Sequence, residues 1–501
     1  MTQARPTNPW PGLWALIIGF FMLLVDTTIV SVANPAIKAA LDPATTNLDN
    51  VVWVTSAYLL TFSVPLLIAG RLGDAFGPKR VYLTGLAVFT LASLGCGLST
   101  TLGMLVAMRA VQGLGAALMS PQSMALIART FEPRNRGAAM GLWGATAGVA
   151  TLVGPLAGGF LVDAFGWQAI FYVNLPVGVI GFVLAAMLVP RLETHPHKFD
   201  VAGIVISAVG LFLLVFGLQE GEKYDWGVIW GPISVWSLII AGVVVLALFV
   251  WQQSRTRAEA LVPLELFRDR NFSTSNVAIA AIGCSITAMS LPMMFFFQLA
   301  RGLTPTQAAL LTVPTAVLSG VLSPLAGMLL VRVDPRVLLV PSLLLVGGGQ
   351  FWYAAMMNGT TDVLMFLWPA ALIGLGSAGM WGPLATTATL DLPPRQAGAA
   401  SGIYNTTRTI GSVLGSAGIA ALMQARLEAN LGGAASGSAS GLGTGQLPAA
   451  IVEPFSSAMG QSMLLSVAAM AVGLVVALFL RRSKATSSMP RRAAEPERPG
   501  V

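Results

Sequence analysis

The segment GRLGDAFGPKR (residues 70–80) is a short charged stretch between two long apolar runs, 51–70 and 79–99. Its glycines, Gly73 and Gly77, permit a tight turn and a close contact between helices. A bilayer core about 30 Å thick is crossed by roughly 20 apolar residues in a helix. The segment and its flanks therefore predict two membrane-spanning helices that are joined at a membrane surface.

The same alternation of apolar runs and short connections continues along the whole chain. Lipid offers no partners for free backbone groups, so each run is predicted to be a helix, and the fold class is an all-α polytopic membrane protein. A β-barrel would need segments of roughly ten residues with alternating hydrophobicity. Fourteen runs are long enough to span, at about 13–40, 51–70, 79–99, 102–129, 136–162, 167–190, 200–219, 231–251, 272–299, 305–331, 336–357, 363–389, 396–423 and 458–480.

The composition excludes other classes of protein. Only 10% of the 501 residues are charged, and the mean hydropathy is +0.76, whereas soluble domains carry about 25% charged residues. This excludes a soluble enzyme and a disordered protein, and the presence of only 2 cysteines excludes a disulfide scaffold. Cys96 and Cys284 both fall in apolar runs, where we expect small, buried, apolar residues.

The basic residues predict the orientation of the chain. With the N-terminus inside, 22 of the 28 Lys and Arg residues lie on cytoplasmic segments, four lie outside, and two lie within spans. This bias places both termini in the cytoplasm. It also explains the net charge of +7 without a nucleic acid partner. The first apolar run is expected to be an uncleaved span rather than a signal peptide.

An internal repeat divides the chain. At an offset of 261 residues, GLGAALM (113–119) aligns with GLGSAGM (374–380), and the segment 133–154 aligns with 394–415. Parallel halves of this kind are one architecture of transporters. The predicted organisation is a six-helix bundle at 1–190, two inserted helices at 191–260, a second six-helix bundle at 261–481 with a flexible outer loop at 424–457, and a disordered cytoplasmic tail at 482–501.

Further motifs lie on individual runs. The first run contains LLVDTTIVSVANPAI (23–37), the fourth RAVQGLGAA (109–117), the fifth GVATLVGPLAGG (148–159) and the sixth WQAIFYVNLPVG (167–178). Together with the turn at 70–80, these motifs resemble the major facilitator superfamily, specifically its branch of fourteen-helix drug:proton antiporters. The resemblance covers nearly all of residues 13–480. It departs from the branch's usual residues at Ser31, Asn34, Pro78 and Gln168.

The resemblance implies that the turn at 70–80 is a conformational latch that stabilises an outward-facing state. Asp74 can pair with Arg71 or with a neighbouring helix end, whereas Lys79 and Arg80 can face the cytoplasm. The alternative is a charged loop that serves topology alone. The second half lacks a counterpart of Asp74, so the latch is expected on one side only. Its predicted residues are Gly70, Arg71, Gly73, Asp74, Gly77, Lys79 and Arg80.

The fifth run is predicted to contain a hinge. Its dense glycines let helices approach closely, and its proline disrupts local helix bonding. In the family this motif seals the site and distinguishes exporters from importers, whereas a plain packing helix is the alternative. The predicted hinge residues are Gly148, Gly154, Pro155, Gly158 and Gly159.

Charged residues inside the runs are few. Asp26 is the one acid deep within an apolar run, and Arg109 and Arg408 are the two bases. At 1.5 Å per residue, all three lie roughly 18–20 Å from the cytoplasmic ends of their helices, as a central site requires. Gln112 shares a helix face with Arg109, and Asn405 adds polarity beside Arg408.

Each of these residues allows two explanations. A carboxylate in an apolar helix can exchange protons near neutral pH, and a nearby arginine favours its charged form. Asp26 is therefore a candidate proton carrier or cation contact, or else a hydrogen-bonded helix partner. The family links the arginine at 109 to proton transfer, whereas a structural arginine would bind nearby carbonyls. Arg408 either balances charge or contacts an anionic group.

The sequence thus predicts a secondary transporter rather than an enzyme. The expected activity is export of lipophilic, amphipathic organic compounds in exchange for protons by alternating access, with neutral or monovalent cationic substrates preferred. Export of an endogenous antibiotic, lipid or siderophore is the alternative, and a receptor or a lipid-modifying enzyme fits less well. We expect a monomer in the bacterial inner membrane, and neither a metal nor a cofactor: no Walker A loop is present, and His195 and His197 lack partner ligands.

Overall fold

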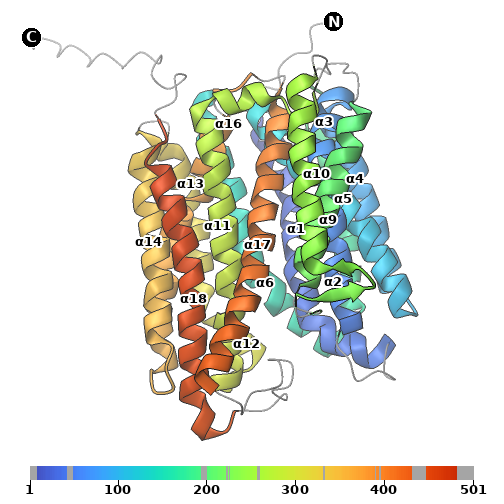
Figure 1. Cartoon of the computed structure of the whole chain (residues 1–501). Coiled ribbons are helices and arrows are strands. Elements are labelled where there is room, and N and C mark those ends of the chain that lie inside the picture. Colours follow the sequence, from blue (N-terminus) through green and yellow to red (C-terminus); the bar gives the residue numbers. More distant parts are fainter. Residues whose placement is uncertain are drawn as a thin grey trace, which may run out of the picture.

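The computed structural model describes residues 8–41, 49–192, 200–221, 224, 226–256, 260–330, 333–389, 391–393, 396–431 and 447–481. Within them the chain is almost entirely helical, and long helices run side by side through the molecule (Figure 1). Backbone N–H and C=O groups find no hydrogen-bond partners in lipid, so they bond to each other within their own helix. This is why the apolar runs fold as helices.

The first part of the chain forms α1 (Trp10–Leu41), α2 (Asp49–Ser63), α3 (Leu66–Phe76), α4 (Pro78–Gly97), α5 (Leu102–Thr130), α6 (Pro133–Phe165), α7 (Ala169–Tyr172) and α8 (Asn174–Leu188). The middle part forms α9 (Val201–Glu220), a hairpin of β1 (Val228–Trp230) and β2 (Ile233–Ser234), and α10 (Val235–Arg255). The last part forms η1 (Leu264–Arg268), α11 (Arg270–Phe295), η2 (Phe296–Ala300), α12 (Pro305–Leu310), α13 (Val313–Leu329), α14 (Pro335–Met356), η3 (Val363–Phe366), α15 (Leu367–Ala378), α16 (Trp381–Thr389), α17 (Ala397–Leu431) and α18 (Ala449–Ala477).

Twelve helices of the described residues are long and apolar enough to cross a membrane, and the count is 13 if the bent pair α2–α3 is one span. That pair bends by 46°, and Pro65, which has no N–H to donate, stands at the break. The fifth predicted run lies in α6, a helix of 33 residues. The predicted count of fourteen spans is not established by the structure.

The predicted outer loop at 424–457 needs a correction. α17 continues to Leu431, and α18 already begins at Ala449, so helix extends into both ends of the segment that was expected to be flexible. Neither end contains the glycines of the Gly/Ser-rich stretch, and helices often project beyond the apolar region that hydropathy detects. The remainder, 432–446, lies outside the described residues, as does the tail at 482–501.

The internal repeat is reflected in helix packing. In the first half Gly115 of α5 lies so close to α4 that an added Cβ would be 2.6 Å from the backbone nitrogen of Phe89. In the second half Gly376 of α15, its equivalent at the 261-residue offset, lies equally close to α14, where a Cβ would be 2.5 Å from the carbonyl oxygen of Ser342. The same helix pair is therefore packed through the same small residue in each half.

The two halves meet backbone to backbone at the end of the bundle that holds the α3–α4 turn. A Cβ at Gly70 of α3 would clash with the carbonyl oxygen of Gly398 of α17, and one at Gly327 of α13 would clash with that of Gly137 of α6. Glycine permits both approaches. The pair α9–α10 packs as a hairpin and touches α2 of the first half and α17 of the second (Figure 1).

Candidate functional site

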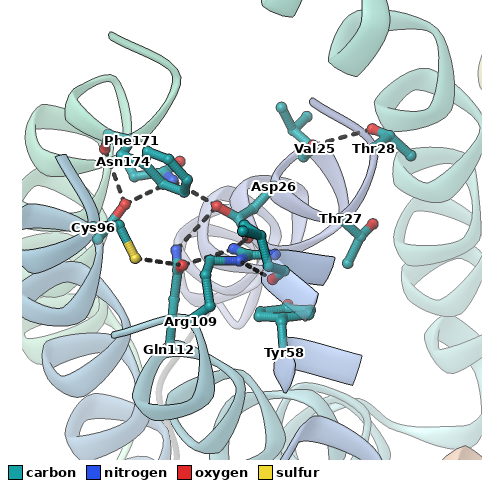
Figure 2. A network of polar contacts seen from close by, with 12 residues as sticks. Val25, Asp26, Thr27, Thr28, Tyr58, Cys96, Arg109, Gln112, Phe171 and Asn174 are labelled. Atoms are coloured by element: carbon teal, nitrogen blue, oxygen red, sulfur yellow. Dashed lines mark hydrogen bonds and ion pairs between the residues drawn. The ribbon is translucent and has the colours of Figure 1, made fainter. Parts of the chain in front are cut away.

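A buried polar network surrounds Asp26 near the middle of α1 (Figure 2). Asp26, Arg109 and Gln112 each expose 0% of their surface. A charge without contact to water needs a partner of opposite sign and further hydrogen bonds. The structure supplies both, and the network draws on helices α1, α2, α4, α5, α7 and α8 of the first half.

The Asp26 carboxylate receives hydrogen bonds on both of its oxygens. Arg109 Nη1 lies 2.6 Å from Oδ2, in an ion pair between two fully buried side chains. Gln112 Nε2 donates to Oδ1 across 3.0 Å, and Asn174 Nδ2 donates to the same oxygen across 3.0 Å. All three partners are donors, so the arrangement matches an ionised carboxylate.

The Arg109 guanidinium is held from several sides. Its Nε donates to the carbonyl oxygen of Val54 on α2 across 3.1 Å, and Nη1 also donates to Gln112 Oε1 across 2.7 Å. The Tyr58 ring lies beneath it, with 4.2 Å from the guanidinium carbon to the ring centroid, which is a cation–π distance. Nη2 has no hydrogen-bond partner among the described residues. The predicted pairing of Arg109 and Gln112 on one helix face is therefore seen in the structure.

Two further residues extend the network to α4. Ser93 Oγ accepts a hydrogen bond from Asn174 Nδ2 across 3.1 Å and donates to the carbonyl oxygen of Phe171 across 2.9 Å. Cys96 Sγ lies 3.7 Å from Gln112 Oε1. Cys96 is buried in an apolar cluster, as the sequence predicted, and it also contacts the polar network through Gln112. Sequence reasoning missed Asn174 and Ser93, although Asn174 belongs to the motif at 167–178.

The predicted residues of α17 do not join this network. Asn405 Oδ1 instead accepts a hydrogen bond from Ser120 Oγ of α5 across 3.3 Å, and its Nδ2 donates to the carbonyl oxygen of Ser401. Arg408 donates no hydrogen bond to any described residue, and its Nε is buried without an acceptor. Of the three charged residues that the sequence placed at one depth, Asp26 and Arg109 form an ion pair, and Arg408 has no ion-pair partner in the part of the chain that the structure describes.

The α3–α4 turn contacts the second half through Asp74. Its Oδ1 and Oδ2 accept hydrogen bonds from the backbone N–H groups of Gly398 and Ala399, across 3.1 Å and 3.0 Å. These donors are at the N-terminus of α17, where the helix dipole favours a negative charge. Arg129 Nη1 is 4.0 Å from Asp74 Oδ1. Of the two predicted partners, the neighbouring helix end is the one that Asp74 binds.

The other residues of the turn differ in their contacts. Gly70 and Gly73 allow close packing against α17 and the Gln122 side chain, and Gly77 has a φ of 92°, which favours glycine. Arg71 donates to the carbonyl oxygens of Ala260 and Leu261, the latter across 3.0 Å. Lys79 donates to the carbonyl oxygens of Ala186 and Val189 at the end of α8, because these carbonyls have no partner within their helix. Arg80 is exposed.

The predicted hinge glycines link α6 to both halves. Gly154 packs against Thr28 and Gly158 against Ile29, both on α1 within one turn of Asp26. Gly148 faces α13, where an added Cβ would be 3.0 Å from Ser319 Oγ. At Gly159 a Cβ would meet only Thr306, at 3.9 Å. The side chain of Pro155 lies outside the described part of the structure.

Metal binding has no support in the described residues, where no group of three or more His, Cys, Asp or Glu side chains could hold an ion. His195 and His197 lie outside them.

Comparison with known proteins agrees with the fold. Residues 16–416 match the model of the Major Facilitator Superfamily. An uncharacterised MFS-type transporter of Mycobacterium tuberculosis is 48% identical over 94% of this chain and 81% of its own length. The tetracenomycin C resistance and export protein of Streptomyces glaucescens is 33% identical over 83% of this chain and 76% of its own. Other relatives are named as multidrug or antibiotic export proteins.

A solved structure supports the fold at low sequence identity. The MFS proton:xylose symporter XylE, bound to 6-bromo-6-deoxy-D-glucose, is 13% identical and superposes with a TM-score of 0.64 over 95% of this chain and 96% of its own. At this identity the likeness concerns the fold alone.

Proposed function

Because the chain belongs to the major facilitator superfamily, and is therefore a multi-pass membrane transporter and not an enzyme, we propose that it exports lipophilic, amphipathic organic compounds in exchange for protons. The relatives named as multidrug and antibiotic export proteins support the export of such compounds. Asp26 is the proposed proton carrier.

The observation that carries this proposal is the all-donor environment of Asp26. A proton on either carboxylate oxygen would face Arg109, Gln112 or Asn174, each of which already donates to Asp26. Protonation of Asp26 therefore breaks the ion pair, and Arg109 keeps its bonds to Val54 and Gln112. The proton thereby changes how α1 is held against α5 and α8.

The hinge transmits this change to the second half. α6 packs on α1 through Gly154 and Gly158, beside Asp26, and on α13 through Gly148. A displacement of α1 on protonation therefore reaches a helix that contacts both halves. Such coupling between a local charge and a two-state packing arrangement is the requirement for alternating access.

The latch favours one of the two states. Asp74 binds the N-terminus of α17, and Gly70 approaches Gly398, only while the halves are closed at the α3–α4 end. We infer that this end faces the cytoplasm, as the basic residues predict, and that the closed arrangement belongs to the outward-facing state. We propose that both termini are cytoplasmic. In this proposal α6 and the bent pair α2–α3 are added to the twelve long apolar helices, which gives fourteen spans: two six-helix bundles and the inserted pair α9–α10. The protein acts as a monomer in the bacterial inner membrane.

The experiment is proton release from vesicles that contain the purified full-length protein and a pH-sensitive dye. A panel of cationic, neutral and anionic lipophilic compounds is added in turn. The proposal expects at least one compound to drive proton movement that Asp26→Asn abolishes. Efflux that continues in the Asp26→Asn variant, or efflux whose rate does not depend on the proton gradient, would contradict the proposed proton exchange. Export of an endogenous product is the second candidate, supported by the name of the Streptomyces glaucescens relative.

A further inference from the structure

Three charged side chains lie deep within the predicted apolar runs: Asp26, Arg109 and Arg408. Asp26 is neutralised by Arg109 at 2.6 Å, and both residues are fully buried. To bind Asp26, a cationic substrate would have to displace the guanidinium of Arg109, which stays charged at any physiological pH. When Asp26 is protonated instead, the pair carries a net positive charge. In neither state does this pair present a free negative charge to a substrate.

Arg408 adds a second positive charge. It is partly buried, its Nε is buried without an acceptor, and the described residues contain no carboxylate in an ion pair with it. The hydroxyl of Tyr404, one turn earlier, is also buried with no hydrogen-bond partner among these residues. A guanidinium nitrogen that is buried without an acceptor is costly, so an acceptor from outside the protein would stabilise it.

Arg408 lies close to the contact between the two halves. Asn405, one turn away on α17, touches Ser120 of α5. Asp74 contacts the N-terminus of α17, and it also contacts Arg129 at the C-terminal end of α5. The beginning of α17 therefore lies beside the end of α5, and the two helices run in opposite directions. Arg408 therefore lies beyond the Asn405–Ser120 contact, on the side towards Arg109.

We infer that the transport site takes neutral or anionic amphipathic compounds and rejects lipophilic cations, and that Arg408 binds the carboxylate or other strong acceptor of the substrate. This rests on the proposed export function and names its substrate class. The sequence predicted neutral or monovalent cationic substrates from the single membrane acid; the inference keeps the neutral compounds and replaces the cations, because that acid is already paired. An arginine bonded to nearby carbonyls is the other explanation, and no such carbonyl is bonded to it among the described residues.

The test uses three coumarins that differ in one substituent: a carboxylate, a carboxamide or a trimethylammonium group. Their binding to the purified full-length protein is measured by quenching of tryptophan fluorescence. A charge-assisted hydrogen bond contributes about 1.5–3 kcal/mol, so the carboxylate is expected to bind about tenfold or more tightly than the ammonium compound. Arg408→Gln should remove this preference, and Arg408→Lys should keep part of it.

Arg426→Gln is the matched control, because Arg426 is exposed on the same helix five turns further on. It should leave all three affinities unchanged. Arg408→Gln should also keep or raise the thermal midpoint, since it removes an unpaired charge, whereas loss of a structural hydrogen bond would lower it. Tightest binding of the ammonium compound, unchanged affinities with Arg408→Gln, or no binding at all would overturn the inference.

Uptake into inside-out vesicles separates this inference from the function on which it rests. If the coumarins bind in the expected order but a proton gradient drives no uptake, the charge preference stands and the proposed proton-driven export fails. If uptake is driven by protons but the ammonium compound is preferred, export stands and the assignment of Arg408 fails.

Discussion

Asn174 donates its side-chain amide to Asp26 Oδ1 across 3.0 Å, although 148 residues separate the two in the chain. The bond joins α8 to α1, and the same amide nitrogen reaches Ser93 on α4. Asn174 therefore ties the orientation of the acid to two helices that do not carry the arginine. We consider it a positioning residue for Asp26.

Asp26→Asn is expected to reduce proton-driven transport to background, because the amide cannot carry a proton. It also leaves Arg109 charged and unpaired, and breaking a buried pair costs about 3–5 kcal/mol. The thermal midpoint should therefore fall as well. The double variant Asp26→Asn/Arg109→Gln should recover stability but not transport. Asp163→Asn, which changes an exposed carboxylate of α6, is the control; transport by Asp26→Asn at the level of that control would refute the role of the acid.

Asn174→Leu is expected to lower the rate of proton-driven transport, because the amide that holds Asp26 Oδ1 towards α8 is lost. Initial transport rates of the purified protein in vesicles would show the loss, and Asn174→Gln, which keeps an amide donor, should restore part of the rate. A rate equal to that of the unmodified protein would argue against the positioning role.

Gly70→Ala is expected to open the α3–α4 end of the bundle. The added Cβ would clash with the carbonyl oxygen of Gly398, and overpacking of this kind costs about 1–3 kcal/mol. Spin labels on cysteines introduced at Arg80 and Val337, both exposed, should report longer distances. Gly348→Ala is the control, because a Cβ there meets nothing within 4 Å. Equal distance distributions for the two variants would argue against the latch.

Asp200 links α9 to α10 and should make stability depend on pH. Burial alone would raise the pKa of its carboxyl, but hydrogen bonds from Gly203 N and the Gln253 and Gln252 amides hold the pKa below its ordinary value of 3.8. A lowered folded-state pKa stabilises the ionised form, so the contribution is present above pH 3.8 and disappears as the pH falls through the lower value.

The measurement for Asp200 is the thermal midpoint in detergent. Asp200→Asn should have a lower midpoint than the unmodified protein at pH 7, and the two should converge as the pH falls below 4. The effect is small because the carboxylate is partly exposed. If the difference in thermal midpoint persists unchanged at acid pH, the charge of the Asp200 carboxylate does not stabilise the α9–α10 pair.

The sequence by itself determined that the chain is a helical membrane protein, which parts of it are apolar, and which charged residues stand inside the membrane. These properties are local: a run of apolar residues must satisfy its backbone within its own helix wherever it lies in the fold. Gln112 was predictable in the same way, because residues three apart share a helix face.

Tertiary structure alone decided which of these residues meet. Asp26 pairs with Arg109 and accepts a bond from Asn174, which Ser93 holds in turn, whereas Arg408 has no ion-pair partner among the described residues. Depth along a helix predicted that all three charges lie near one level, but it carries no information on the direction in which a side chain points around the helix axis. That direction is set by packing against helices far away in the sequence, through close approaches such as that of Gly70 to Gly398, and so the pairing of charges emerges only when the helices are assembled.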